Sequence, residues 1–114
     1  MEARAVHRFI SSTPRKMRLL VDLIRGMSVD KAIEVLHFST QHASKDAEKV
    51  LRSAVANLMN QDDSTRVEPE ELYVKEAFVN GGPTLKRIQP APMGRAFRVR
   101  KRSCHLTIIV ASKA

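Results

Sequence analysis

The chain has 114 residues, a length typical of one domain with a modest core and too short for two independent ones. Hydrophobic residues make up 43% of it, which favours folding, and a formal net charge of +8 favours a polyanionic partner such as nucleic acid. No apolar run reaches the length of a membrane span, and charged residues rather than an apolar signal segment follow Met1. We therefore expect a cytoplasmic or organellar protein with no membrane partner. Cys104 has no second cysteine to pair with, so we expect a small buried residue and no internal disulfide.

The positive charge is concentrated at the two ends of the chain. Residues 1–20 carry a net charge of +4, residues 21–77 carry −4, and residues 78–114 carry +8 with no carboxylate at all. The middle of the chain therefore has the charge balance of an ordinary domain body, and the basic ends are the candidates for contact with a polyanion.

Three helices are predicted after a first strand over residues 3–10, where small or apolar residues roughly alternate with basic ones. Thr13 is expected to cap a helix over 14–25, with Pro14 at its first position and Gly26 as a left-handed stop. Ser28 is expected to cap a short second helix that ends near His37. A third helix is predicted from about Thr40, and its small or apolar positions follow helical spacing: Ala43, Ala47, Val50, Leu51, Ala54, Val55 and Leu58.

Two further strands complete the predicted elements. The polar segment 60–71 is a loop by composition, and its Asp62–Asp63 pair is interpreted as turn chemistry rather than a metal site. Residues 72–80 and 103–111 show strand patterns. The fold class is therefore α+β, with three helices packed on a small three-stranded antiparallel or mixed sheet and a long extended β-hairpin arm. We expect one domain over 1–114, with a globular body over 1–80 and 95–114 and the protruding arm over about 81–97.

The arm is predicted from a stretch that separates the last two strands. Residues 81–94 are too many for an ordinary hairpin loop, and the stretch 81–105 contains seven Lys or Arg, three Pro and no carboxylate. Ten extended residues span on the order of 30 Å, about the width of the body. Such an arm is too poor in apolar residues to hold one shape alone, so a polyanion is expected to order it. The alternative is a flexible basic loop that is simply solvated.

RNA is the expected polyanion, recognised mainly through phosphates and shape. Aromatic residues make up only 4% of the chain, which argues against stacking on unpaired bases as the main mode. The alternative function is a DNA-binding regulator of the helix-turn-helix type, with its turn at residues 25–28. The second helix would then carry Asp30 and Glu34, and it is too acidic for a major-groove reader.

The sequence indicates no catalytic, metal or cofactor site and no small-molecule substrate. Cys104 and His105 are neighbours on a predicted strand, so their side chains are expected on opposite faces. His37 and His42 have poor spacing for zinc. The glycines at 81–82 match no phosphate-binding motif and are expected to serve backbone geometry where the arm leaves the sheet.

Three segments of the chain resemble the large-subunit ribosomal protein L-twenty-two family, and the resemblance covers essentially the whole sequence. These segments are STPRKMRLLVDLIRGMSVDKAIEVL, KVLRSAVANLMN and GPTLKRIQPAPMGRAFRVRKRSCHLTIIV. The most specific parts are P-x-K-x-R-L and the closing GRA-x-R-x-x-KR-x-x-H-x-T. The resemblance implies a structural protein that binds large-subunit ribosomal RNA, supports early assembly and meets neighbouring ribosomal proteins. It also implies a body near the exit of the peptide tunnel and an arm that lines the tunnel beside the nascent polypeptide.

Three groups of residues are then expected to contact RNA or the nascent polypeptide. The resemblance places Lys86, Arg87, Arg95, Arg98, Arg100, Lys101 and Arg102 on RNA along the arm, and His105 is interpreted as an RNA-facing or packed residue. The resemblance also assigns the tunnel-lining tip to Ile88, Gln89, Pro90, Ala91, Pro92 and Met93, which is less basic than the family's common pattern. The charge pattern itself predicts a second basic surface from Arg4, Arg8, Arg15, Lys16 and Arg18.

Overall fold

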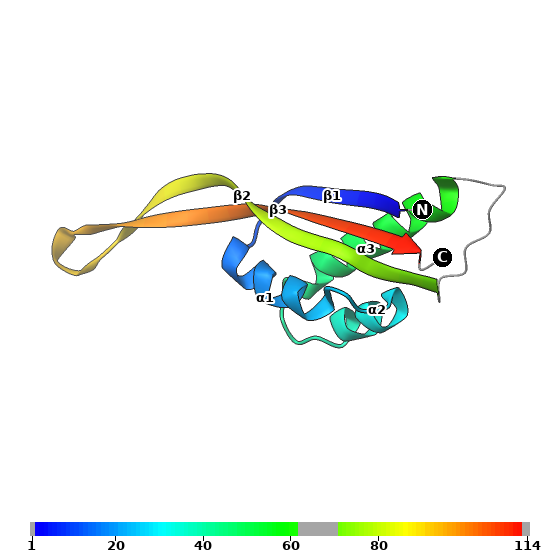
Figure 1. Cartoon of the computed structure of the whole chain (residues 1–114). Coiled ribbons are helices and arrows are strands. Elements are labelled where there is room, and N and C mark those ends of the chain that lie inside the picture. Colours follow the sequence, from blue (N-terminus) through cyan, green and yellow to red (C-terminus); the bar gives the residue numbers. More distant parts are fainter. Residues whose placement is uncertain (1, 62–70, 113–114) are drawn as a thin grey trace.

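The computed structural model describes residues 2–61 and 71–112 (Figure 1). Its elements are, in chain order, β1 (Glu2–Ile10), α1 (Pro14–Ile24), α2 (Val29–His37), α3 (Ser44–Gln61), β2 (Leu72–Pro90), a 3₁₀ turn (Pro92–Gly94) and β3 (Ala96–Ser112). The predicted α+β class is confirmed, including the three helices, the three-stranded sheet and the long hairpin. The Asp62–Asp63 pair lies outside the described residues.

The sheet has the order β1-β3-β2, and both strand pairs are antiparallel. The C-terminal part of β3 therefore lies in the middle of a three-stranded sheet, whereas its N-terminal part pairs with β2 alone. This second region is a two-stranded ladder that runs from Thr84↔Arg102 to Pro90↔Ala96, and the pair Gly81↔Cys104 joins it to the three-stranded part, where Cys104 also pairs with Ile10. We call residues 81–104 the hairpin.

The hairpin projects well beyond the helices (Figure 1). The molecule measures 67 × 24 × 15 Å, and its radius of gyration is 17.3 Å. A compact chain of this length is expected to have a radius of gyration of about 13 Å. The strands predicted to end at residue 80 and to begin at residue 103 thus continue through most of the basic stretch. Only the turn between Ala91 and Arg95 interrupts them.

The core lies between the helices and one face of the sheet. The inward positions of β3 are Cys104, Leu106, Ile108 and Val110, all at 0% exposure. Helix α3 covers this face with a stripe of small and aliphatic residues, as its spacing predicted: Ala47, Val50, Leu51, Ala54 and Leu58 are buried, and Val55 is partly buried. Each large aliphatic side chain removed from water here contributes about 1.5–3 kcal/mol before entropy costs.

The helix boundaries agree with the sequence patterns, except that the start of α3 was predicted wrongly. Thr13 and Ser28 occupy the capping positions of α1 and α2, yet neither side chain makes the capping hydrogen bond. Their backbone carbonyls accept the first helical hydrogen bonds, from the N–H groups of Met17 and Ala32. Helix α3 begins at Ser44 rather than near Thr40, because a preceding turn is closed by the Ser44 hydroxyl, which donates to the carbonyl of Gln41 over 2.6 Å.

The connection between α1 and α2 is bonded to the sheet. Gly26 has the predicted left-handed backbone, with φ of 84°, and its N–H donates to the carbonyl of Val74 over 3.0 Å. The Arg25 guanidinium donates to the carbonyl of Ala77 over 2.6 and 3.2 Å and also pairs with Asp22. This turn therefore anchors α1 to β2, a structural use that gives the helix-turn-helix alternative no support.

Two bulges oppose each other across β3 where the three-stranded sheet gives way to the hairpin. On β1 the register shifts between His7 and Ile10, and Phe9 takes a φ of 58°. On β2 it shifts between Gly81 and Thr84. Because a bulge bends and twists its strand, this pair of irregularities sets the direction in which the hairpin leaves the body.

Candidate nucleic-acid interface

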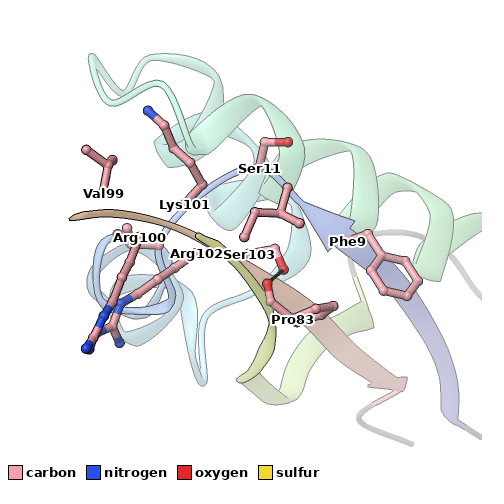
Figure 2. A pocket seen from close by; sticks show the side chains of 10 residues that line it. Phe9, Ser11, Pro83, Val99, Arg100, Lys101, Arg102 and Ser103 are labelled. Carbon is pink, nitrogen blue, oxygen red and sulfur yellow. Dashed lines mark hydrogen bonds between the residues drawn. The ribbon is translucent and has the colours of Figure 1, made fainter. Parts of the chain in front are cut away.

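The register of the hairpin divides its cations between two faces. Residues directly opposite in an antiparallel ladder point to the same side, and the side alternates along the strand. One side, which we call the cationic face, carries Lys86, Arg98, Arg100 and Arg102 together with Ile88. The other, which we call the mixed face, carries Arg87 and Lys101 with Leu85, Phe97 and Val99. Figure 2 shows the side chains of Arg100 and Arg102 extending together, away from those of Val99 and Lys101.

The charges of the hairpin are not compensated within the protein. No ion pair joins a hairpin cation to any residue in the described part of the chain. All seven predicted hairpin cations are exposed. Their fields therefore add over a narrow two-stranded ribbon, an arrangement suited to lying along a row of phosphates.

A groove lies at the root of the hairpin, with a volume of about 640 Å³ (Figure 2). Apolar side chains from all three strands line it beside the hairpin cations; its members include Phe9, Pro83, Leu85, Val99, Arg100, Lys101 and Arg102. The Ser103 hydroxyl closes one wall by donating to the carbonyl of Pro83 over 2.7 Å. We call this hollow the root groove.

Gly81 and Gly82, which were predicted to serve backbone geometry, lie in the bulge beside the root groove, and only one of them has close neighbours. A Cβ at position 82 would lie 2.6 Å from the hydroxyl oxygen of Ser103 and 3.3 Å from its carbonyl carbon. A Cβ at position 81 would meet nothing within 4 Å. Only Gly82 is thus required by close approach.

The predicted tip residues come together at the far end of the hairpin. Ile88, Gln89 and Pro90 end β2, and Ala91, Pro92 and Met93 form the turn. The N–H of Ala91 donates to the carbonyl of Arg95 over 2.8 Å, and Met93 has a φ of 64°. Met93 is 94% exposed, so the end of the hairpin presents an apolar side chain rather than a charge.

The five basic residues predicted to form a second surface are all exposed, but they lie on two surfaces rather than one. Arg4 alternates with buried Ala3 and Ala5, so it points to the side of the sheet away from the helices. Arg4 and Arg8 both line a hollow on that side. Arg15, Lys16 and Arg18 lie on α1, on the helical side. Arg18 also donates to the carbonyl of Val79 over 3.1 Å, which leaves other donors of its guanidinium free for a ligand.

His105 packs against a residue that the sequence patterns did not single out. Its Nδ1 accepts a hydrogen bond from the backbone N–H of Phe9 over 3.0 Å. The two rings meet edge to face with centroids 5.0 Å apart. No local signal could have paired residues that lie 96 positions apart.

The two residues considered for catalysis, Cys104 and His105, are kept apart by the strand on which they lie. Cys104 is buried in the core and His105 lies on the other face of β3, as strand alternation predicted. Burial raises the pKa of the Cys104 thiol, and the nearby charge of Asp46 raises it further. Within residues 2–61 and 71–112, no three His, Cys, Asp or Glu side chains form a metal-binding group. None of the helices in this part of the chain has the length and apolar content needed to cross a membrane.

Comparison with known proteins agrees with this architecture. Residues 5–111 match the family described as "Ribosomal protein L22p/L17e". Proteins named "Large ribosomal subunit protein uL22" are 53% identical in Chlorobium phaeobacteroides, over 96% of this chain and 94% of the relative, and 52% identical in Chlorobaculum tepidum, over 96% and 92%. The Bacteroides fragilis protein of that name is 51% identical over 92% of this chain and 76% of its own length. The chain therefore belongs to the ribosomal protein L22p/L17e family, whose members are structural, non-enzymatic proteins of the large ribosomal subunit.

Proposed function

We propose that this chain binds large-subunit ribosomal RNA and that its hairpin carries most of the contact. The observation that supports this most strongly is the uncompensated charge of the hairpin: seven cations and no carboxylate on a two-stranded ribbon. Guanidinium groups pair with phosphates in a fixed geometry, and each phosphate contact releases counterions. The N-terminal cations Arg4, Arg8, Arg15, Lys16 and Arg18 contribute from the body.

The hairpin also fits a path through a narrow RNA-walled space. Its two strands leave the body in one direction, and its tip is apolar, with Ile88 73% and Met93 94% exposed. We place the body near the exit of the nascent-peptide tunnel and the tip, Ile88 to Met93, against the nascent chain. The neighbours of the body are other large-subunit proteins. The location is the cytoplasmic ribosome, or the ribosome of an organelle.

The first experiment is sedimentation of cell lysate through a sucrose gradient, before and after a high-salt wash. We expect the protein to remain with the large subunit at about one copy per particle. Free protein at the top of the gradient would contradict ribosomal RNA binding. Depletion of the protein is expected to halt large-subunit assembly at an early precursor, and normal subunit yield would contradict the assembly role.

The position of the tip needs a separate test. Ribosomes that contain Met93→Cys, modified with a photoreactive group, are stalled on labelled nascent chains of graded length. We expect a cross-link to the nascent chain. Lys45→Cys, on an exposed position of α3, is the matched control and should give none. Equal cross-linking from both positions, or none from position 93, would remove the tip from the tunnel.

A further inference from the structure

The phenylalanines of this protein are not used in its core. Phe9 is 66% exposed, Phe38 79%, Phe78 40% and Phe97 61%. Aromatic rings usually supply much of the apolar area that a small protein buries, yet here aliphatic residues fill the core. Single exposed rings are common, but rings that gather on one exposed surface indicate a ligand that covers them.

Two of these rings lie on the side of the sheet that the helices leave uncovered. They border a hollow of about 520 Å³, which we call the open face; it is lined by Arg4, Val6, Arg8, Phe9, Phe78, Asn80, His105 and Thr107. The register explains the grouping, because Val6 and Phe78 both lie opposite Thr107 on the central strand, and Asn80 lies opposite His105. Three strands thus contribute to one surface.

The backbone of β1 is distorted in a way that brings Phe9 to this surface. Ala3 and Ala5 point inward, so regular alternation would turn residue 9 inward as well. The bulge gives the inward place to Ile10, which is 3% exposed, and leaves Phe9 outside with a φ of 58°. Bulky residues rarely adopt this conformation, and such strain is found mostly at functional sites. His105 fixes the arrangement through the Phe9 N–H and the edge-to-face ring contact.

We infer that the open face binds an unpaired nucleobase of an RNA strand, which stacks on Phe9 and Phe78 while its flanking phosphates lie on Arg4 and Arg8. Aromatic faces stack with any base, guanidinium groups hold phosphates, and the amide of Asn80 can bond to a base edge. None of the described residues that line the hollow is a carboxylate, which favours a nucleic acid over a protein partner. The inference rests on the RNA binding proposed above and adds to it a contact that depends on the base.

The test compares two ligands that have equal numbers of phosphates. The full chain is titrated with a labelled eight-nucleotide adenosine RNA and with the abasic strand of the same length, and binding is followed by fluorescence anisotropy. We expect the adenosine strand to bind about tenfold more tightly, since stacking is worth that much for a single base. Phe9→Leu together with Phe78→Leu should reduce the ratio of the two affinities, adenosine strand to abasic strand, towards one. The affinity for the abasic strand should stay unchanged.

Control variants test whether the preference for the adenosine strand arises at the open face. Phe38→Leu removes a ring that is more exposed than those of Phe9 and Phe78, from the end of α2, and should leave the ratio unchanged. Leucine retains apolar bulk, and the double variant is used only if its thermal unfolding midpoint equals that of the native chain. An affinity ratio near one in the native chain would overturn the inference. A preference for the adenosine strand that is lost only in Phe97→Leu would also overturn it, because the base would then bind the hairpin.

The outcome is separable from that of the proposed function. If neither strand binds, RNA binding itself fails; if both bind with equal affinity, only the base contact fails. Ultraviolet irradiation of intact large subunits gives an independent result. A nucleotide adduct on Phe9 or Phe78 would support the inference, whereas a cross-link from these residues to another protein would assign the open face to a protein partner and overturn it.

Discussion

Lys86 and Arg100 lie directly opposite each other on the cationic face of the hairpin. Like charges in directly opposed positions destabilise a strand pair, and no carboxylate within residues 81–104 offsets them. The geometry that would attract a polyanion therefore weakens the free hairpin, so we expect ordering of the hairpin to be coupled to the RNA binding proposed above.

Reversing one of these charges should separate the two effects. In Lys86→Glu the new carboxylate faces Arg100, and an opposite-charge pair contributes roughly 0.2–1 kcal/mol to a ladder. We expect slower amide hydrogen exchange in the free hairpin but weaker RNA binding, measured by anisotropy at fixed salt. Lys31→Glu, at an exposed position of α2, makes the same change in net charge and should affect neither measurement comparably. Faster exchange in Lys86→Glu would show that the two side chains do not face each other.

Neutralising three cations of the hairpin should change the salt dependence of binding. Arg98→Gln, Arg100→Gln and Arg102→Gln together are expected to weaken binding and to reduce the log–log salt slope by about one unit for each phosphate that is no longer neutralised. The control variant carries Lys31→Gln, Lys45→Gln and Lys49→Gln, three cations of the helices with the same total charge. Equal slopes for the two triple variants would mean that net charge alone, and not the hairpin, determines affinity.

Gly81 and Gly82 are adjacent residues in the bulge at the hairpin root, so each serves as the control for a substitution of the other. Gly82→Ala places a Cβ within 2.6 Å of the Ser103 hydroxyl and should disturb its bond to Pro83. We expect a loss of about 1–3 kcal/mol in the free energy of unfolding, the usual cost of overpacking, with faster amide exchange around residue 84. Gly81→Ala meets nothing within 4 Å and should be nearly neutral. Indistinguishable urea unfolding curves for the two variants would refute the close approach.

Leu51 tests the core face of α3. It is fully buried, so Leu51→Ala should cost roughly 2–5 kcal/mol in urea unfolding followed by circular dichroism. Leu19→Ala deletes the same atoms from a side chain that is 60% exposed and should change stability by less than about 0.5 kcal/mol. A mild effect at position 51 would mean that α3 packs on the sheet through another face.

Acid should weaken the ion pairs that Glu48 makes with Arg52 within α3 and with His37 of α2. Hydrogen bonds from Arg52, together with the charge of His37, lower the pKa of Glu48 in the folded protein. A lowered folded-state pKa means that the stabilisation is complete above the unfolded-state value of about 4.3 and is lost as pH falls through the lower folded value. Glu48→Gln should therefore flatten the fall of the thermal midpoint in that range. Glu34→Gln, whose carboxylate pairs with no described residue, is the control, and parallel profiles for native and Glu48→Gln proteins would contradict the prediction.

Local sequence patterns predicted the helices of this protein well, because helix ends and buried helix faces depend on residues that are close in the sequence. Pro14 and Gly26 mark the ends of α1 to within two residues, and the apolar spacing of α3 identifies its buried stripe. The start of α3 was predicted too early because the turn before Ser44 depends on a side-chain bond that helical periodicity does not encode. The contact between Phe9 and His105 joins distant segments through a bulge, and only the register of the assembled sheet brings it about.

The place of β3 in the sheet has a consequence for the order of events during synthesis. Strands β1 and β2 do not pair with each other, and each finds its partner only in β3, the last strand to be made. The apolar sides of α1 and α3 therefore have no complete sheet to pack on until β3 has been synthesised. Because β3 runs unbroken from the hairpin into the middle of the body, the step that closes the core also fixes the direction of the hairpin. A polypeptide released before this strand would present its basic and its apolar segments together and unfolded, a state open to proteolysis and aggregation.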